Sequence, residues 1–158
     1  MATAFIGIGI PGSGKTTVLK QAALNRGITY INKDDIREEL LGNAEDQSQN
    51  RRVWHESLLR TNEALALGND VIIDATNVET WKRQELIKEL RSSGASRIVG
   101  LYFNTKLSVA RERNQKRVRV VPDDVLSWMQ QKLDEAPPSL EEGFDEILEG
   151  EEIEKAFT

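Results

Sequence analysis

The sequence predicts an α/β fold in which helices cover both faces of a mostly parallel, buried sheet, giving three layers. Short apolar runs alternate with segments of helical spacing four times along the 158 residues, a pattern typical of parallel sheets. Hydrophobic residues make up 39% of the chain, which is enough to fill a core without disulfides or structural metals. Because no linker, repeat or low-complexity segment interrupts the chain, we expect one domain over residues 1–158.

The first half of the chain supplies two strands and three helices. AFIGIGI at 4–10 is an apolar run that ends at Pro-Gly, which predicts a buried strand. Apolar residues at helical spacing follow, with glycine as the stop signal, and a polar loop separates the second helix from the third. We expect a helix at 15–26, a strand at 28–32, a helix at 34–41, a loop at 43–50 and a helix at 51–67.

The second half continues the alternation. VIID at 71–74 is a continuous β-branched run, as a central parallel strand should be. Proline is tolerated in the first turn of a helix, so Pro122 opens the last long helix, and Pro137-Pro138 end it. We expect helices at 79–92 and 105–115 around a strand at 97–103, and residues 144–148 are a candidate for a short last strand.

Composition excludes several kinds of chemistry. The chain has no cysteine and one histidine, which excludes thiol nucleophiles, cysteine-bound metals and metal sites built on two histidines. No apolar run approaches the roughly 18 residues of a membrane span, and the N-terminus lacks a secretory signal. We therefore expect a cytoplasmic protein with no membrane partner. The single histidine, His55, is expected at a packing or surface position.

Charge is distributed unevenly along the chain. The net charge is −5, but residues 134–158 carry ten acidic side chains and one basic one, so residues 1–133 have a net charge of +4. Basic residues gather at 106–119. We expect the acidic C-terminal segment 134–158 to be a solvated cover over a mildly basic body.

The most informative motif follows the first predicted strand. GIPGSGKT at 9–16 matches the phosphate-binding loop pattern G-x-x-x-x-G-K-[ST] and opens a predicted helix. Glycines let successive backbone N–H groups surround an anion, and the helix N-terminus adds positive charge. Lysine then bridges the β- and γ-phosphates and the threonine hydroxyl ligates Mg²⁺. The expected nucleotide-binding residues are Gly12, Ser13, Gly14, Lys15, Thr16 and Thr17.

A second candidate element lies directly after the second predicted strand. Asp34 and Asp35 stand at the strand's carboxyl end, on the edge where ligands bind in parallel sheets. One of them could accept the proton of an attacking hydroxyl, and Arg37 could bind an acceptor phosphate. The alternative is that Asp35 caps the following helix and the other charges are solvated.

The basic segment supplies a third element. Residues 111–121 read as an arginine-bearing lid that closes over a triphosphate, excludes water and stabilises the migrating phosphoryl group. The alternative is a solvated basic helix face. The N-K-x-D motif of GTPases is absent, because Asn32-Lys33-Asp34 lacks the spacing and comes too early.

Four segments, in this order and spacing, resemble the 5′-kinase domains of bacteriophage polynucleotide kinases and the wider group of zeta-toxin-like small P-loop kinases. They are GIPGSGKTT, INKDDIREEL, VIIDATN and RNQKRVRVVPDDVLSWMQQKL, and the resemblance covers residues 4 to about 135. It implies a three-layer P-loop kinase fold with a five-stranded parallel sheet in order 2-3-1-4-5.

The resemblance also implies roles for individual residues. Asp34 would be the general base on a 5′-hydroxyl, Arg37 would bind the terminal nucleotide's phosphate, and Arg117 would be the lid arginine on the ATP phosphates. Lys15 and Thr16 would hold the phosphates and Mg²⁺. Asp34, Lys15 and Arg117 are thus the expected catalytic residues, and the expected acceptor contacts are Asp34, Asp35, Arg37, Thr76 and Asn77.

One position departs from the resemblance. The phage enzymes have an aspartate directly before Thr-Asn at the end of the third strand, whereas this chain has Ala75 there and Asp74 one residue earlier. Neighbouring strand residues point to opposite faces, so Asp74 is expected to act at the Mg²⁺ site rather than to orient Arg37. We do not expect a 3′-phosphatase activity, because no D-x-D-x-T motif occurs in these residues.

The sequence therefore favours an ATP- and Mg²⁺-dependent kinase acting on the 5′-hydroxyl of DNA or RNA, with a role in nucleic acid repair. Two alternatives stay open. One is a kinase of the same fold for a nucleoside, sugar, antibiotic or similar alcohol, and the other is a nucleotide-dependent binding or toxin-like module. Tryptophans at 54, 81 and 128 have packing as their default role, and any of them could stack on a base.

Overall fold

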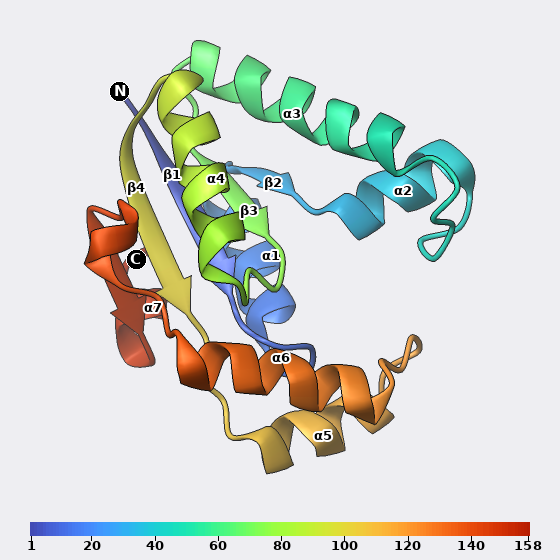
Figure 1. The fold of residues 1–158 in the computed structure, drawn as a ribbon. Helices are drawn as coiled ribbons and strands as arrows, with labels where there is room; N and C mark the ends of the chain where they lie inside the picture. Colours follow the sequence, from blue (N-terminus) through green and yellow to red (C-terminus); the bar gives the residue numbers. More distant parts are fainter.

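Five parallel strands form one central sheet in the computed structural model, which describes residues 1–158 (Figure 1). The strand order is β2-β3-β1-β4-β5, which confirms the order that the resemblance implied. The strands are β1 (Ala2–Ile8), β2 (Thr29–Ile31), β3 (Val71–Asp74), β4 (Ala95–Tyr102) and β5 (Glu146–Glu149). Because all the pairings are parallel, every strand ends at the same edge of the sheet.

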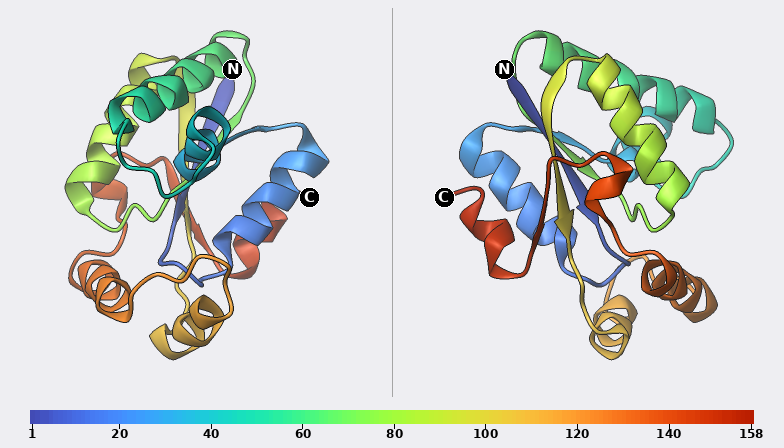
Figure 2. Two further views of the ribbon diagram at one scale, coloured as in Figure 1. Left: turned by 90° about the vertical axis from the view of Figure 1, so that its right-hand side faces the viewer. Right: turned by 60° about the vertical axis from the view of Figure 1, so that its left-hand side comes forward.

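Helices cover both faces of this sheet, as the two views of Figure 2 show. One face carries α1 (Lys15–Arg26) and the short α7 (Glu151–Lys155), and the other carries α3 (Asn50–Ala66) and α4 (Thr80–Ser92). Helix α2 (Lys33–Leu41) packs on α3. Helices α5 (Leu107–Gln115) and α6 (Asp123–Glu135) pack on each other beyond the carboxyl ends of the strands (Figure 1).

Alternation along the strands divides the core into two clusters. In β3, Val71 and Ile73 join the cluster beneath α3 and α4, while Ile72 between them joins the cluster beneath α1 and α7. All three are buried, so the continuous apolar run of this strand reflects helices on both faces. The two clusters fix the strands and leave the carboxyl edge to polar loops.

Two helix or strand limits differ from the sequence expectation in an informative way. β1 ends at Ile8 and not at residue 10, because Gly9 and Ile10 turn away as the start of the glycine-rich loop, where the Gly9 N–H donates to the Thr76 carbonyl at 3.0 Å. Pro122 lies just before α6 and not inside its first turn, with ψ at 140°. The sequence analysis predicted neither the 3₁₀ turn at Leu140–Glu142 nor the short helix α7.

The acidic segment 134–158 is more than a solvated cover. It supplies β5, the edge strand beside β4, and Asp145 accepts a hydrogen bond from the backbone N–H of Ile98 at 2.8 Å. Glu142 forms a buried ion pair with Arg83 of α4. The negative charges of this segment therefore anchor the last strand. None of the helices combines the length and the apolar character that a membrane span would need.

Candidate active site

The glycine-rich loop at residues 9–16 connects β1 to α1 at the carboxyl edge of the sheet. Gly12 and Gly14 have φ angles of +84° and +88°, in the left-handed region that favours glycine. A Cβ atom on Gly12 would lie 2.4 Å from the Ala110 carbonyl oxygen of α5. Glycine at this position is therefore required both by the turn and by the close approach of α5.

A positively lined cavity of about 320 Å³ lies over this loop. Arg113 of α5 and Arg117 of the lid face Lys15 across it, and no acidic side chain contributes to its walls. Such a cavity favours a polyanion, because three cations and the N-terminus of α1 act on the same space. The structure brings together the expected residues Gly12, Ser13, Gly14, Lys15, Thr16, Thr17 and Arg117. Arg113 was missed as an individual site residue, although it lies in the basic segment that the sequence predicts to form the lid.

Asp74 is the buried centre of the polar contacts beneath the loop. Its Oδ2 accepts a hydrogen bond from the Thr16 hydroxyl at 2.9 Å and another from the Tyr30 hydroxyl. Its Oδ1 lies 3.8 Å from the Lys15 ammonium. Burial and the Asp74 carboxylate raise the pKa of Tyr30, so this tyrosine stays a hydrogen-bond donor at neutral pH. Tyr30 is a further residue that the sequence analysis missed.

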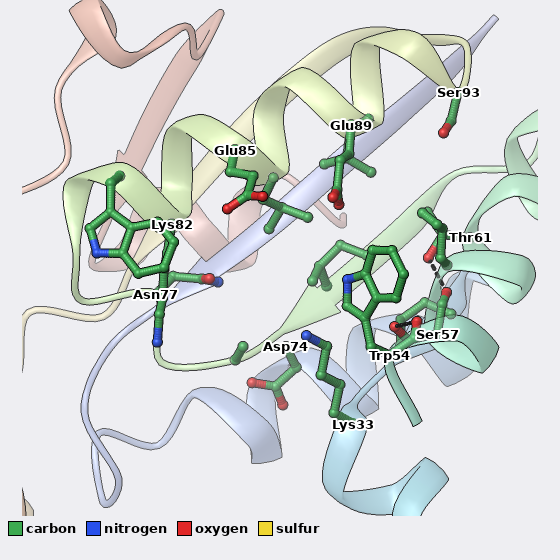
Figure 3. A pocket seen from close by; sticks show the side chains of 17 residues that line it. Lys33, Trp54, Ser57, Thr61, Asp74, Asn77, Lys82, Glu85, Glu89 and Ser93 are labelled. Atoms are coloured by element: carbon green, nitrogen blue, oxygen red, sulfur yellow. Dashed lines mark hydrogen bonds between the residues drawn. The ribbon is translucent and has the colours of Figure 1, made fainter. Parts of the chain in front are cut away.

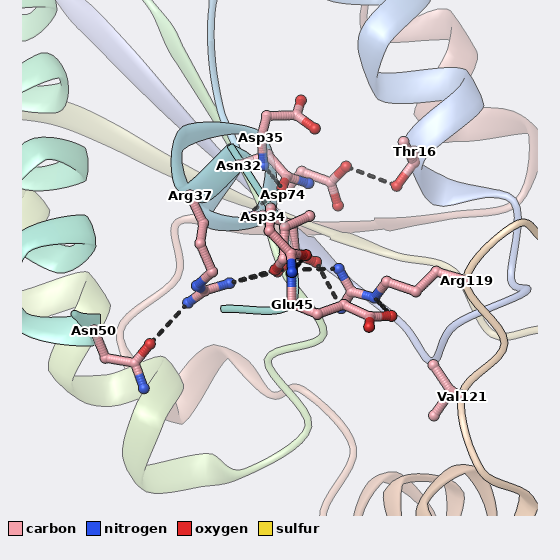
Figure 4. A network of polar contacts seen from close by, with 12 residues as sticks. Thr16, Asn32, Asp34, Asp35, Arg37, Glu45, Asn50, Asp74, Arg119 and Val121 are labelled. Atoms are coloured by element: carbon pink, nitrogen blue, oxygen red, sulfur yellow. Dashed lines mark hydrogen bonds and ion pairs between the residues drawn. The ribbon is translucent and has the colours of Figure 1, made fainter. Parts of the chain in front are cut away.

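Asp74 belongs to the loop side of the site and makes no contact with Arg37. Figure 4 shows its side chain turned toward Thr16. Thr76 lies at the cleft described below. Asn77 has a φ of +48° and donates its side-chain amide to the Gly7 carbonyl at 2.8 Å. The amide of Asn77 thus fixes the loop after β3 to β1.

Two buried polar atoms at this site lack a hydrogen-bond partner, the Ser13 hydroxyl and Asp74 Oδ1. Buried polar groups are rarely left unpaired, so both atoms are suited to a bound group. The Ser13 hydroxyl fits a phosphate oxygen, and Thr16 with Asp74 fits Mg²⁺, which prefers few protein ligands and takes the rest from phosphate and water. The chain has no cluster of three or more His, Cys, Asp or Glu side chains that could hold a metal ion.

A larger cleft of about 770 Å³ adjoins the loop and runs between α2 and the lid. Asp34, with a half-exposed side chain, lies on its wall at the start of α2. Asn32 caps this helix, since its Oδ1 accepts hydrogen bonds from the N–H groups of Asp34 at 2.9 Å and Asp35 at 3.2 Å. The alternative that Asp35 is the cap is therefore wrong. Asp35 instead lies 3.4 Å from Lys20 in an exposed ion pair.

Arg37 lies behind Asp34 and does not line the cleft. Its side chain is only 9% exposed and its Nη1 contacts Asp34 Oδ1 at 2.8 Å. Its other guanidinium contacts are the Ala44 carbonyl at 3.4 Å and the Asn50 side chain at 3.3 Å. In this structure Arg37 orients Asp34 and holds the loop between α2 and α3, so its contact with an acceptor phosphate stays a prediction.

Arg119 of the lid reaches across the cleft to the same carboxylate. Its Nη2 lies 3.4 Å from Asp34 Oδ2, and its Nε lies 3.5 Å from Glu45 Oε1 (Figure 4). The sequence places Arg119 in the basic segment but gives no signal for this pairing, because the partners are far apart in the chain. The segment predicted to form the lid therefore contacts α2 and the loop after it across the cleft.

Lys15 gives the site a measurable pH dependence. Burial lowers the pKa of Lys15 below its ordinary value of 10.5, and the nearby Asp74 only partly offsets this effect. A bound polyanion favours the protonated lysine. The affinity for inorganic tripolyphosphate should therefore be highest below the lowered pKa of Lys15 and should fall as the pH rises through that pKa. This fall should occur at a lower pH than the deprotonation of an exposed lysine.

Calorimetric titration with tripolyphosphate from about pH 7 to about pH 10 measures this fall. The Lys15→Met variant should bind weakly at every pH, with no such decrease. Wild-type affinity that remains constant over this whole range would contradict the assignment of the lowered pKa to the anion site.

Comparisons with known proteins agree with this architecture. A family model described as AAA domain matches residues 5–136. A gluconokinase from Sinorhizobium meliloti 1021 is 21% identical, with a TM-score of 0.57 over 97% of this chain and 87% of that chain. A putative kinase from Chloroflexus aurantiacus J-10-fl is 18% identical, with a TM-score of 0.71 over 94% and 86% of the two chains. A chain of a Pnkp1/Rnl/Hen1 complex is 22% identical, with a TM-score of 0.62 over 77% of this chain and 40% of that chain.

Proposed function

Because the chain belongs to the AAA domain family, we propose that it is an ATP- and Mg²⁺-dependent kinase that phosphorylates the 5′-hydroxyl end of DNA or RNA. One observation carries the proposal. The positively lined cavity over the loop and the cleft that holds Asp34 share Pro11, Lys15, Thr16 and Arg117. A donor phosphate and an acceptor hydroxyl would therefore meet between Lys15 and Asp34.

On the donor side, the residues of the loop and lid hold charge in place. Bound MgATP supplies the transferable phosphoryl group and the charge of the metal. Lys15 and Arg117 would hold the phosphate oxygens from opposite sides, with Arg113 beside them. Thr16 and Asp74 would hold the metal. Thr16, Asp74 and Lys15 are ordered by contacts with one another before any ligand binds, and such preorganisation is the main protein contribution to phosphoryl transfer.

On the acceptor side, Asp34 would accept the proton of the attacking hydroxyl. Arg37 fixes one of its oxygens from behind, and Arg119 lies near the other from the lid. Thr76 lines the same cleft and can donate to the acceptor. Closure of the lid over the cleft would exclude water, so that the phosphoryl group passes to the hydroxyl rather than to water.

Two features support a nucleic acid end as the acceptor. The sequence resembles phage 5′-kinase domains through the loop, the Asp34 element and the lid. The cleft is also large, about 770 Å³, and Lys20 and Arg119 lie along it. Lysine and arginine contacts to phosphates would position a strand without reading its bases.

A small-molecule alcohol is the second candidate acceptor, and the position of Arg37 favours it. Its guanidinium is buried, and its two Nη atoms already bind Asp34, Ala44 and Asn50, which leaves only the buried Nε without a partner. Arg37 therefore offers little to an acceptor phosphate. One of the similar structures is described as a gluconokinase, which would fit an acceptor of that size.

Transfer from γ-labelled ATP separates these candidates. We expect label on a 5′-hydroxyl oligonucleotide and none on the same oligonucleotide with a 5′-phosphate. Labelling of gluconate or a nucleoside, with the oligonucleotide unlabelled, would favour the second candidate. Binding of ATP with no transfer to any alcohol would exclude both.

A further inference from the structure

A separate pocket of about 290 Å³ lies between α3 and α4, above the carboxyl ends of β2 and β3 (Figure 3). Its floor is apolar and includes Ile31 and Ile73 from the two strands and Leu90 from α4. No residue of the phosphate cavity contributes to it. The roles proposed above leave this pocket without an occupant.

Aromatic side chains form part of its wall. Trp54 of α3 and Trp81 of α4 both line the pocket, and they are 42% and 57% exposed. In Figure 3 the ring of Trp54 projects from α3 into the space that faces α4. Exposed indole rings at a concave site offer flat apolar faces, and such faces bind planar rings by stacking.

Charged groups surround the same space without partners. Lys33, Glu85 and Glu89 line the pocket, and none of them forms a side-chain hydrogen bond or an ion pair within 4.0 Å. Burial lowers the pKa of Lys33 and raises that of Glu89, and the opposite charges of the two groups only partly offset these shifts. Figure 3 shows Lys33 rising into the pocket from below and the two glutamates entering from α4. One donor and two acceptors therefore face a flat apolar site.

The pocket continues from the acceptor cleft and not from the donor cavity. It shares Lys33, Asp74 and Ala75 with the cleft, and the cleft in turn shares Lys15 and Arg117 with the phosphate cavity. The three spaces thus follow one another in series. A group bound in the pocket belongs to the molecule that enters the cleft, on the side away from the donor phosphates.

We propose that this pocket binds the nucleobase of the acceptor's terminal nucleotide, with the ring stacked on Trp54 and its polar edge facing Lys33 and Glu89. The proposal rests on the kinase function proposed above and names the part of the acceptor that this site selects. A base carries both donors and acceptors on its edge, matching the unpaired lysine and glutamates. The pocket is lined by three acidic side chains and two basic ones, namely Asp74, Glu85 and Glu89 with Lys33 and Lys82. This excess of negative charge favours a neutral ring over a phosphate.

Two 5′-hydroxyl oligonucleotides test the proposal when they differ only in the terminal residue, one with a base and one abasic. The wild-type protein should phosphorylate the base-bearing strand with a KM at least about tenfold lower. Trp54→Ala should remove this difference by raising the KM of the base-bearing strand alone, and Trp54→Phe should restore most of it. Trp128→Ala changes a tryptophan of similar exposure on α6, outside the three spaces, and should keep the preference.

Fluorescence gives a readout that needs no turnover. The chain has three tryptophans, so Trp81→Phe with Trp128→Phe leaves Trp54 as the sole reporter. Deoxyadenosine 3′-monophosphate should quench this protein saturably, and abasic deoxyribose phosphate should not. A matched protein that retains only Trp128 should show no quenching.

The outcomes separate the two proposals. Equal KM values for both strands in the wild-type protein, or no quenching of Trp54 by the nucleotide, would overturn the base pocket. If neither strand is labelled while ATP binds, the kinase proposal fails, and the fluorescence titration alone then decides on the pocket. Melting curves of the Trp54 variants confirm that the proteins compared are folded.

Discussion

The Asp34→Asn variant is expected to lose about 10²- to 10⁴-fold in kcat for phosphoryl transfer while still binding ATP. An amide cannot accept the proton of the attacking hydroxyl, and Asp34 is the carboxylate of the cleft that both Arg37 and Arg119 contact. Asparagine keeps a side-chain oxygen toward Arg37, so the local contact is weakened rather than removed. Single-turnover transfer and equilibrium ATP binding, measured side by side, separate the chemical step from donor binding.

Glu39→Gln is the matched control for this experiment. Glu39 is also a carboxylate of α2, but it pairs with Arg60 at 2.8 Å, is 58% exposed and lies outside the cleft. The Glu39→Gln substitution should therefore leave the rate of phosphoryl transfer unchanged. If Asp34→Asn keeps wild-type turnover, Asp34 is not the proton acceptor. A wild-type protein that binds ATP and transfers no phosphate would instead favour a nucleotide-dependent binding module.

Local patterns predict much of this fold because the forces that form each element act within a few residues. Helix α1 begins at Lys15 and ends at Arg26 as expected, since glycines stand on both sides in the left-handed conformation. β3 is recognised from its own apolar run, Val71–Asp74. Sequence reasoning also identifies Lys15 and Thr16, because the phosphate-binding loop is contiguous in the chain.

The remaining features depend on contacts between distant residues. Arg37 was expected to face the acceptor, yet its position is set by Asn50 at the start of α3 and by the Ala44 carbonyl. Tyr30 becomes part of the site only when β2 and β3 pair and bring Asp74 beside it. No local periodicity encodes such pairs, and a charge count cannot show which acidic residues are buried. The pocket beside Trp54 likewise needs α3 and α4 to be placed together.

Arg83 carries the largest expected effect on stability. Its side chain is fully buried and pairs with Glu142 through two hydrogen bonds, at 2.5 and 3.0 Å. It also donates to the carbonyls of Asn77 at 3.0 Å and Ala136 at 2.9 Å. One guanidinium thus joins α4, the loop after β3 and the acidic C-terminal segment. Arg83→Met should lower the free energy of unfolding by about 3–5 kcal/mol, because Glu142 keeps a buried, unpaired charge.

Two further variants distinguish the cost of the unpaired charge from lost packing. Arg83→Met with Glu142→Leu should recover a large part of the loss, since apolar residues of similar size replace buried ion pairs well. Arg91→Met removes another arginine of α4 that binds the same segment, but its pair with Asp145 is exposed, so it should cost below about 1 kcal/mol. Urea unfolding measures all three. If Arg83→Met and Arg91→Met prove equally mild, Glu142 is solvated in solution, and the acidic segment does not hold the loop of Asn77 at the acceptor cleft.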